Sequence, residues 1–191
     1  MTTSDERFKI GISAQIDEQV CLGYQYREGC GPTIIGDHAR IRCGAILYGD
    51  VKIGDHLSVG HYAVVREKTA IGDYVVVGSQ TVIEGQVNIG SYVKIESRVF
   101  IPTHTQIGSY VFIGPGTLIT NDKFPLRQRE NYAPKGAIIE DHVSLGAGSV
   151  LIPGVRIGYM SLIGAGSVVT KDVPDHSLVV GNPGKIRPLP K

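Results

Sequence analysis

The sequence contains 191 residues, with 19 Lys and Arg against 18 Asp and Glu and a formal net charge of +1. This length suits one domain with a substantial core, and the balanced charge argues against nucleic acid or a membrane surface as the main partner. No run of 18 apolar residues is present, and the first nine residues lack the apolar core of a signal peptide, so we expect a cytoplasmic protein. The three cysteines, at positions 21, 30 and 43, lack metal-type spacing and predict reduced thiols without a metal site.

Residues 1–34 carry scattered aliphatic residues, including Ile10, Ile16 and Leu22, without a steady period. They precede a regular repeat, and the terminal units of repeat proteins commonly cover the open end of the core. We therefore expect an irregular N-terminal cap over residues 1–34.

A six-residue period governs residues 35–174. Every sixth residue is Ile, Val or Leu, and the residue four positions later is mostly small or β-branched. The aliphatic positions are Ile35, Ile41, Leu47, Ile53, Val59, Val65, Ile71, Val77, Ile83, Ile89, Ile95, Ile101, Ile107, Ile113 and Ile119, followed after a break by Ile139, Leu145, Leu151, Ile157, Ile163 and Val169. A period of six fits neither an α-helix nor one long alternating strand, but it fits a short strand followed by a corner.

A longer period of 18 residues lies on top of the first. Ile35-Gly36-Asp37-His38 recurs in similar form from Ile53, Ile71, Ile89 and Ile107. Three hexapeptides therefore close one triangular coil, with the aliphatic side chains inside and the backbone groups paired between coils. About seven coils are expected, over residues 35–52, 53–70, 71–88, 89–106, 107–124, 139–156 and 157–174.

The repeat is interrupted once, by a loop over residues 123–138. Twenty residues separate Ile119 from Ile139, where one step needs six, and insertions in repeat proteins are frequent on a binding face. The loop carries Arg127, Arg129, Lys135, Phe124 and Tyr132, which suit an anionic ligand with a flat ring or, alternatively, a neighbouring subunit. The proline-rich residues 175–191 read as an extended tail across the outside of the last coils.

This pattern resembles the left-handed parallel β-helix of hexapeptide-repeat acyltransferases over about three quarters of the chain. The resemblance implies an all-β triangular prism formed by a single domain of residues 1–191. The left hand comes from the resemblance, because general sterics favour right-handed crossovers.

Two motifs resemble those of one class of enzymes within that family. Asn121-Asp122-Lys123-Phe124-Pro125 and Lys135-Gly136-Ala137-Ile138-Ile139 resemble segments of nucleotide-sugar N-acetyltransferases, whereas residues 163–174 and 180–185 match an ending shared by hexapeptide acyltransferases generally. The resemblance implies transfer of an acetyl group from acetyl-CoA to the amine of a UDP- or dTDP-linked amino sugar. It also implies a homotrimer with sites between neighbouring prisms.

The expected acceptor site lies beside the loop. His104 precedes Asp122 by 18 residues, so the two are vertical neighbours, and a histidine can accept the proton of a sugar amine while a carboxylate orients it. We expect His104 and Asp122 to be catalytic and Asn121, Glu84 and Arg127 to contact the substrate. The alternatives are an exposed polar edge without chemistry, and an amine that needs positioning alone.

The cofactor site is expected along the last coils, where small outer residues let a ligand approach the backbone. Acetyl-CoA would lie against Ala147, Gly164 and Ala165, with Lys171 and Lys185 near its phosphates. The alternative is that these small residues only form corners.

Other readings remain open. Gly49-Asp50-Val51 and Val59-Gly60-His61 resemble parts of γ-class carbonic anhydrases, but Arg66 stands where that family has a second histidine, and an arginine cannot serve as a neutral zinc ligand. A non-catalytic scaffold is the third reading. Galactoside O-acetyltransferases usually carry a histidine where this chain has Gly148. The lack of that histidine here disfavours an activity of this class.

Overall fold

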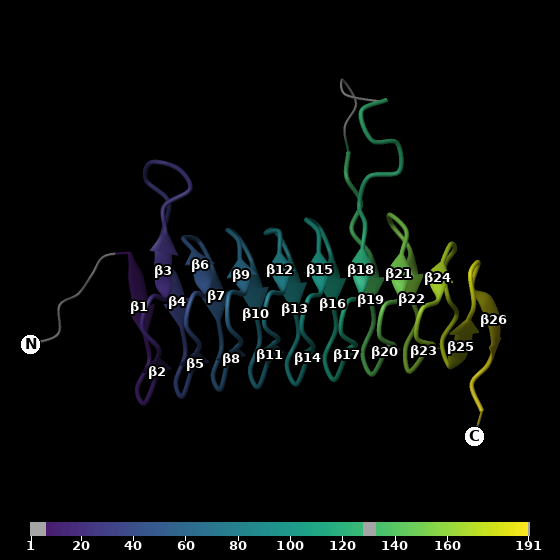
Figure 1. Ribbon diagram of the computed structural model, residues 1–191, viewed down its shortest axis with the longest axis horizontal. Helices are drawn as coiled ribbons and strands as arrows, with labels where there is room; N and C mark the ends of the chain where they lie inside the picture. Colours follow the sequence, from purple (N-terminus) through teal and green to yellow (C-terminus); the bar gives the residue numbers. More distant parts are fainter. Residues whose placement is uncertain (1–6, 128–132, 191) are drawn as a thin grey trace, which may run out of the picture.

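The computed structural model describes residues 7–127 and 133–190, and within these ranges the chain forms 26 short strands and no helix. The described residues therefore include no helix long and apolar enough to cross a membrane. The strands stack into three sheets that form the walls of a long prism (Figure 1).

Each sheet takes one strand from each turn of the chain. Sheet A contains β1 (Phe8–Ile10), β4 (Thr33–Ile35), β7 (Lys52–Ile53), β10 (Ala70–Ile71), β13 (Asn88–Ile89), β16 (Gln106–Ile107), β19 (Ile138–Ile139) and β22 (Arg156–Ile157). Sheet B contains β2 (Gln15–Ile16), β5 (Arg40–Ile41), β8 (Ser58–Val59), β11 (Val76–Val77), β14 (Lys94–Ile95), β17 (Phe112–Ile113), β20 (Ser144–Leu145), β23 (Leu162–Ile163), β25 (Ser177–Val180) and β26 (Lys185–Pro188). Sheet C contains β3 (Cys21–Tyr24), β6 (Ile46–Tyr48), β9 (Val64–Val65), β12 (Val82–Ile83), β15 (Phe100–Ile101), β18 (Leu118–Ile119), β21 (Val150–Leu151) and β24 (Val168–Val169).

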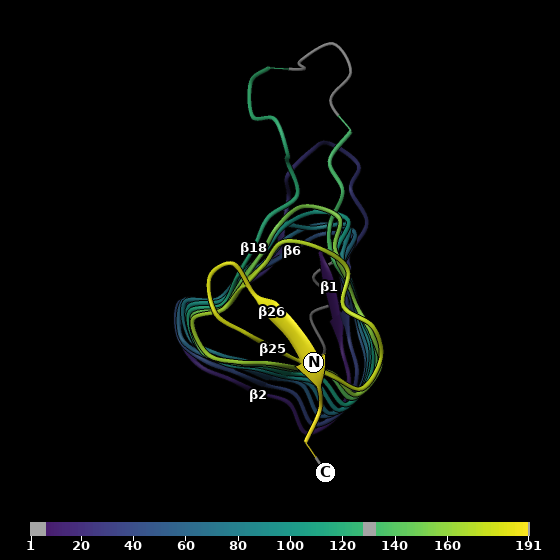
Figure 2. The same ribbon diagram turned by 90° about the vertical axis from the view of Figure 1, so that its right-hand side faces the viewer.

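The prism is a left-handed parallel β-helix, as the resemblance implied. Figure 2 looks along the axis from the C-terminal end, and the chain passes from β1 on the right through β2 below to β6 at the upper left while it approaches the viewer. All pairings between successive coils are parallel, with Ile35 beside Ile53 and Ile71 beside Ile89.

The core consists of the two inward positions of each hexapeptide. All 21 aliphatic residues at the six-step positions are buried, and so are the small residues four positions later, such as Ala39, Ala45 and Ala63. The side chain before each aliphatic residue points outward, as the two-residue strands require.

The corner between sheets A and B is built by hydrogen bonds from backbone to side chain. The amide of Asp37 donates to Asp55 Oδ1 at 2.7 Å, and the amide of Asp55 donates to Asp73 Oδ1 at 2.8 Å. The preceding Gly36 cannot carry a Cβ, because that atom would lie 2.2 Å from Asp55 Oδ1. This explains the recurring Ile-Gly-Asp/Ser sequence, in which each carboxylate or hydroxyl accepts a hydrogen bond from the amide of the equivalent residue in the preceding coil.

An aromatic column runs along the same corner. His38, His56, Tyr74, Tyr92, Tyr110 and His142 stack face to face with ring centroids 4.4–5.0 Å apart. All six residues of the column are exposed.

The N-terminal residues are more regular than the cap expected from the sequence. β1, β2 and β3 add one strand to each sheet, so eight coils are present, one more than expected. Ile10 pairs with Ile35 and Leu22 with Leu47, each 25 residues apart. The difference arises from a loop of residues 25–32, which breaks the phase in the sequence without breaking the stack.

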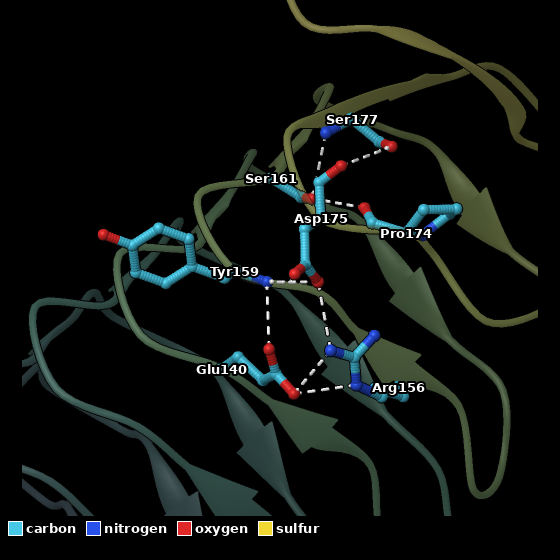
Figure 3. A network of polar contacts seen from close by, with 7 residues as sticks. All are labelled: Glu140, Arg156, Tyr159, Ser161, Pro174, Asp175 and Ser177. Atoms are coloured by element: carbon cyan, nitrogen blue, oxygen red, sulfur yellow. Dashed lines mark hydrogen bonds and ion pairs between the residues drawn. The ribbon is translucent and has the colours of Figure 1, made fainter.

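The C-terminal tail closes the opposite end. β25 pairs with β23, and β26 folds back antiparallel on β25 and crosses the open triangle in Figure 2, with Ile186 packed against the core. The start of the tail is held by the network in Figure 3, where Arg156 bridges Glu140 at 2.7 Å and Asp175 at 3.0 Å. This path differs from the expected tail across the outer faces, because Val173 and Val179 are buried and continue the core.

A matched pair of substitutions tests the inward phase. Val77→Asp should prevent folding or lower the midpoint of thermal unfolding strongly, because Val77 is 0% exposed and an unpaired buried charge costs several kcal/mol. Val76→Asp makes the same change one residue earlier, where the side chain is 37% exposed, and should leave the unfolding midpoint nearly unchanged. Equal effects of both substitutions, measured by circular dichroism, would contradict the assignment of inner and outer positions.

Candidate functional site

Both loops of the prism leave from one edge, the corner between sheets C and A. The loop of residues 25–32 follows β3, the longer loop follows β18, and both project on the same side in Figures 1 and 2. We call this corner the polar edge and define it by residues 48–50, 66–68, 84–86, 102–104 and 170–172 and by the described residues of the long loop. Polar side chains gather here from successive coils, because residues 18 apart occupy equivalent corners.

Asn121 anchors the base of the long loop. Its Nδ2 donates to Thr103 Oγ1 at 2.9 Å, and its carbonyl oxygen accepts a hydrogen bond from the amide of Lys135 at 2.9 Å. Asn121 therefore joins the outgoing and returning arms of the loop to the coil below. Asn121 thus stacks on Thr103, which lies 18 residues earlier, one coil below.

His104 and Asp122 lie near the same loop base but make no hydrogen bond or ion pair with each other. Asp122 Oδ1 accepts from the amide of Phe124 at 2.9 Å and so shapes the start of the loop. His104 is exposed, has φ of 66°, and lies against the returning arm, because a Cβ on Gly136 would come within 2.3 Å of its carbonyl carbon. The imidazole is thus exposed at the foot of the loop, and no carboxylate within residues 7–127 and 133–190 makes a hydrogen bond or ion pair with it.

Glu84 is held by a cation from the coil below. Arg66 Nη1 lies 3.3 Å from Glu84 Oε2, Arg66 Nη2 lies 3.0 Å from Glu67 Oε1, and the guanidinium lies 5.6 Å from the ring centroid of Tyr48. Burial opposes the charge of Arg66, but the adjoining carboxylates raise its pKa above the ordinary value. Any contact between Glu84 and a substrate would therefore compete with this ion pair.

Arg127 lies in the exposed part of the long loop, where its amide donates to the carbonyl oxygen of Phe124 at 3.0 Å. The other loop residues singled out from the sequence, Arg129 and Tyr132, lie outside the described residues.

The N-terminal end of the polar edge contains an anchor that sequence reasoning missed. Asp50 accepts hydrogen bonds from Tyr26 Oη at 2.7 Å and from the amide of Gly31 at 2.8 Å, and Arg27 Nη2 lies 3.6 Å away. The hydrogen bond from Tyr26 is the main cause that lowers the pKa of Asp50 below its ordinary value. The only sequence signal was the broken phase between Leu22 and Ile35, which concealed the loop.

The corner between sheets B and C has the opposite character in the C-terminal coils. Gly116, Gly148 and Gly166 occupy its outermost position with φ between 64° and 68°, and a Cβ at any of the three would meet nothing within 4 Å. The same position in earlier coils carries Tyr62, Gln80 and Arg98, also at positive φ. We call the segments 114–116, 146–148 and 164–166 the bare edge, since backbone lies open to solvent along it.

Four of the five residues expected to bind the cofactor lie along or beside this edge. Ala147, Gly164 and Ala165 belong to it, and Lys185 pairs with Val180 in the hairpin that packs against Gly164. Lys171 does not join them, because it follows β24 and so lies on the polar edge.

Sheet C separates the two edges, and its outer face is apolar over seven coils. The outward residues of the strands are Ile46, Val64, Val82, Phe100, Leu118, Val150 and Val168. Sheets A and B mix charged or polar residues into the equivalent rows, with Lys52 and Asn88 in sheet A and Arg40 and Lys94 in sheet B.

The alternative reading as a zinc enzyme receives no geometric support. Within residues 7–127 and 133–190, no group of three or more His, Cys, Asp or Glu side chains is placed to hold a metal ion. His61 is exposed, and Arg66, at the position of the family's second histidine, is engaged by carboxylates.

Two family models match the repeat. The model described as bacterial transferase hexapeptide (six repeats) matches residues 32–67 and 86–121, and the model described as hexapeptide repeat of succinyl-transferase matches residues 136–171. Together they cover most of the coils described above.

Several relatives with assigned names are acetyltransferases. A galactoside O-acetyltransferase of Lactococcus lactis subsp. lactis is 45% identical over 78 residues, which cover 39% of this chain and 38% of the relative. A dTDP-3-amino-3,6-dideoxy-alpha-D-galactopyranose 3-N-acetyltransferase of Aneurinibacillus thermoaerophilus is 48% identical over 50 residues, which cover 26% of each. The chain thus spans less than two fifths of these relatives, and they include both O- and N-acetyltransferases.

A solved structure provides the longer match. The hexapeptide-repeat containing acetyltransferase of Vibrio cholerae O1 biovar eltor, in complex with acetyl coenzyme A, is 32% identical with a TM-score of 0.54, covering 61% of this chain and 69% of that one. The repeat, the left-handed coil and these similarities agree, and the chain belongs to the hexapeptide-repeat acyltransferase family.

Proposed function

We propose that the protein is an acyltransferase that moves an acetyl group from acetyl-CoA to the amine of a nucleotide-linked amino sugar. The observation that carries the proposal is the bare edge, where three successive coils leave their outer backbone uncovered at Gly116, Gly148 and Gly166. A long flexible ligand with amide groups, such as the pantetheine arm of CoA, fits such a strip, because it can approach the exposed backbone closely.

The C-terminal end of the bare edge has a basic residue nearby, which suits the phosphate groups of the cofactor. Lys185 lies in the hairpin beside Gly164, and an ammonium group there would attract the CoA phosphates. Lys171 would reach a cofactor on this edge only from a neighbouring copy, since it lies on the polar edge of its own prism. The acetyl-CoA complex of the Vibrio cholerae relative supports the choice of cofactor.

The polar edge is the proposed acceptor site. Asn121 and Asp122 hold the base of the long loop beside His104, and Arg127 lies further out on the loop, where it would contact the substrate. Glu84 would contact the sugar if Arg66 releases it. The dTDP-amino-sugar N-acetyltransferase among the relatives supports an amine acceptor.

The reaction would form one C–N bond and break one C–S bond. The free amine of the sugar attacks the thioester carbonyl carbon, the CoA thiolate leaves, and the proton lost from nitrogen passes to His104 and then to the thiolate. In this role the exposed imidazole of His104 acts without a carboxylate partner among the described residues. If the amine is already neutral when it binds, positioning alone would carry the rate.

The positions of the two edges support a homotrimer. Within one prism they border opposite sides of sheet C, so thioester and His104 lie apart. If three copies turn their apolar sheet C faces toward a common axis, the bare edge of each copy meets the polar edge of the next. The row from Ile46 to Val168 provides the apolar surface that such an interface requires.

Blocking the bare edge tests the cofactor site. Ala147→Leu should raise the dissociation constant of acetyl-CoA by roughly tenfold or more, because the side chain would occupy the strip on which the cofactor lies. Cys43→Leu places the same side chain at the equivalent corner of an N-terminal coil and should leave binding unchanged. Calorimetric titration provides the measurement, and equal affinities of both variants would contradict this location.

The interface is tested by charge on sheet C. Val82→Arg should convert the trimer into monomers at micromolar concentration, since it buries three unpaired cations around the axis. Val76→Arg makes the same change on sheet B and should leave the trimer intact. Sedimentation equilibrium distinguishes the two, and a trimeric Val82→Arg variant would move the interface to another face.

Removal of His104 tests the chemistry. His104→Ala should lower kcat with a UDP- or dTDP-amino sugar by roughly 10²–10⁴ without changing acetyl-CoA affinity, measured by thiol release across a panel of such sugars. Asp122→Asn keeps an acceptor for the amide of Phe124 and should change kcat far less. Near-normal turnover by the His104→Ala enzyme would leave positioning of the amine as the better account.

A further inference from the structure

A cationic hollow lies at the N-terminal end of the polar edge. The loop of residues 25–32 stands beside the outer face of sheet A, and a hollow of about 410 Å³ opens between them over β4, β7 and β10. Arg27, Lys52 and Lys68 line it from three separate elements, whereas Asp50 is its one acidic residue. Ala70 leaves room at the centre, because its outward position carries longer side chains in the coils on either side, Lys52 and Asn88.

The charge of this hollow is not neutralised from within. Asp50 is already engaged by Tyr26 Oη, the amide of Gly31 and the guanidinium of Arg27. Lys52 and Lys68 are exposed, and neither ammonium group makes a hydrogen bond or ion pair with any residue in the described ranges. Lys52 and Lys68 therefore remain as two free cations in the described residues. They lie beside the pair of Arg27 and Asp50, which fixes the loop that forms one wall of the hollow.

A second hollow continues from the first along sheet A. It has a volume of about 570 Å³ and shares Ile34, Lys52 and Ala70 with the cationic one. Its remaining surface is mostly apolar, with the glycine corners of β7 and β10 at its far side. The two hollows together offer a cationic end and an adjoining apolar floor, which match a phosphate group joined to a flat organic body.

We propose that Lys52, Lys68 and Arg27 form a binding site for a phosphate-type dianion, and that its ligand is the diphosphate of a nucleotide. The position of the cationic hollow relative to His104 favours a nucleotide as the source of the diphosphate. Lys68, Gln86 and His104 occupy the same corner position in successive coils, so two coil spacings of about 4.8 Å place His104 about 10 Å away along the edge. That separation is similar to the length of a sugar ring joined to a diphosphate. This assignment of the source rests on the proposed function, whereas the anion site itself does not.

The experiment measures binding of three probes by calorimetry: inorganic pyrophosphate, dTDP and UDP. Lys52→Gln and Lys68→Gln should each raise the dissociation constants by roughly 3- to 10-fold, because each removes one charge-assisted contact at an exposed site. Lys94→Gln removes an exposed lysine from sheet B and should have no effect. Binding should also weaken as salt rises, since the cations are exposed.

Each outcome decides a separate point. Lysine-dependent binding of the nucleotides that is tighter than that of pyrophosphate supports both the site and its source. Lysine-dependent binding of pyrophosphate with no gain for the nucleotides supports the anion site and removes the nucleotide as its ligand. Absence of binding by the wild-type protein, or unchanged binding by the Lys52→Gln/Lys68→Gln double variant, overturns the proposal. If acetyl-CoA fails to bind while pyrophosphate binding depends on the lysines, the proposed function fails and the anion site stands.

Discussion

The structure depends on one constraint, which is that every coil must place its inward side chains directly above those of the coil before it. Each strand has only two residues in most coils, so no strand is stable alone and pairing with both neighbours supplies its hydrogen bonds. Ile53 pairs with Ile71, and Ile71 pairs with Ile89, so the core is a set of continuous aliphatic columns. Loss of one inward position therefore affects three coils.

Within this constraint the corners are free to differ, and both proposed binding sites lie where they differ. The corner between sheets A and B repeats one solution, in which an Asp or Ser side chain accepts a hydrogen bond from the amide of the preceding coil and an aromatic ring stacks outside. The corner between sheets B and C changes character along the axis, from Tyr62 and Arg98 to the open glycines of the last coils. The corner between sheets C and A carries the loops and the charged groups.

The coils could be predicted from the sequence because each depends on spacing alone. Ile95 or Leu145 is buried wherever the phase is kept, and the stacking of Asn121 on Thr103 follows from a difference of 18. The same rule did not give the contact expected between His104 and Asp122, because Asp122 begins an insertion and bonds locally to Phe124 instead. A vertical spacing predicts where backbones lie, but not which partner a side chain selects.

The first coil and the anchor at Asp50 escaped prediction for a related reason. Seven extra residues between Leu22 and Ile35 shift the phase, so the strands before them looked irregular although they pair normally. The partners of Asp50, Tyr26 and Gly31, lie in that excursion and have no repeat position from which they could be inferred.

The insertions also explain how such a prism can change. Ile107 pairs with Ile139 across 32 residues in the same register that joins Ile89 and Ile107 across 18, so the long loop leaves the stack undisturbed. A loop at this corner can thus be lengthened, shortened or exchanged without cost to the columns inside. Selection on such a scaffold can act on its recognition segments one at a time, while the folding unit is inherited intact.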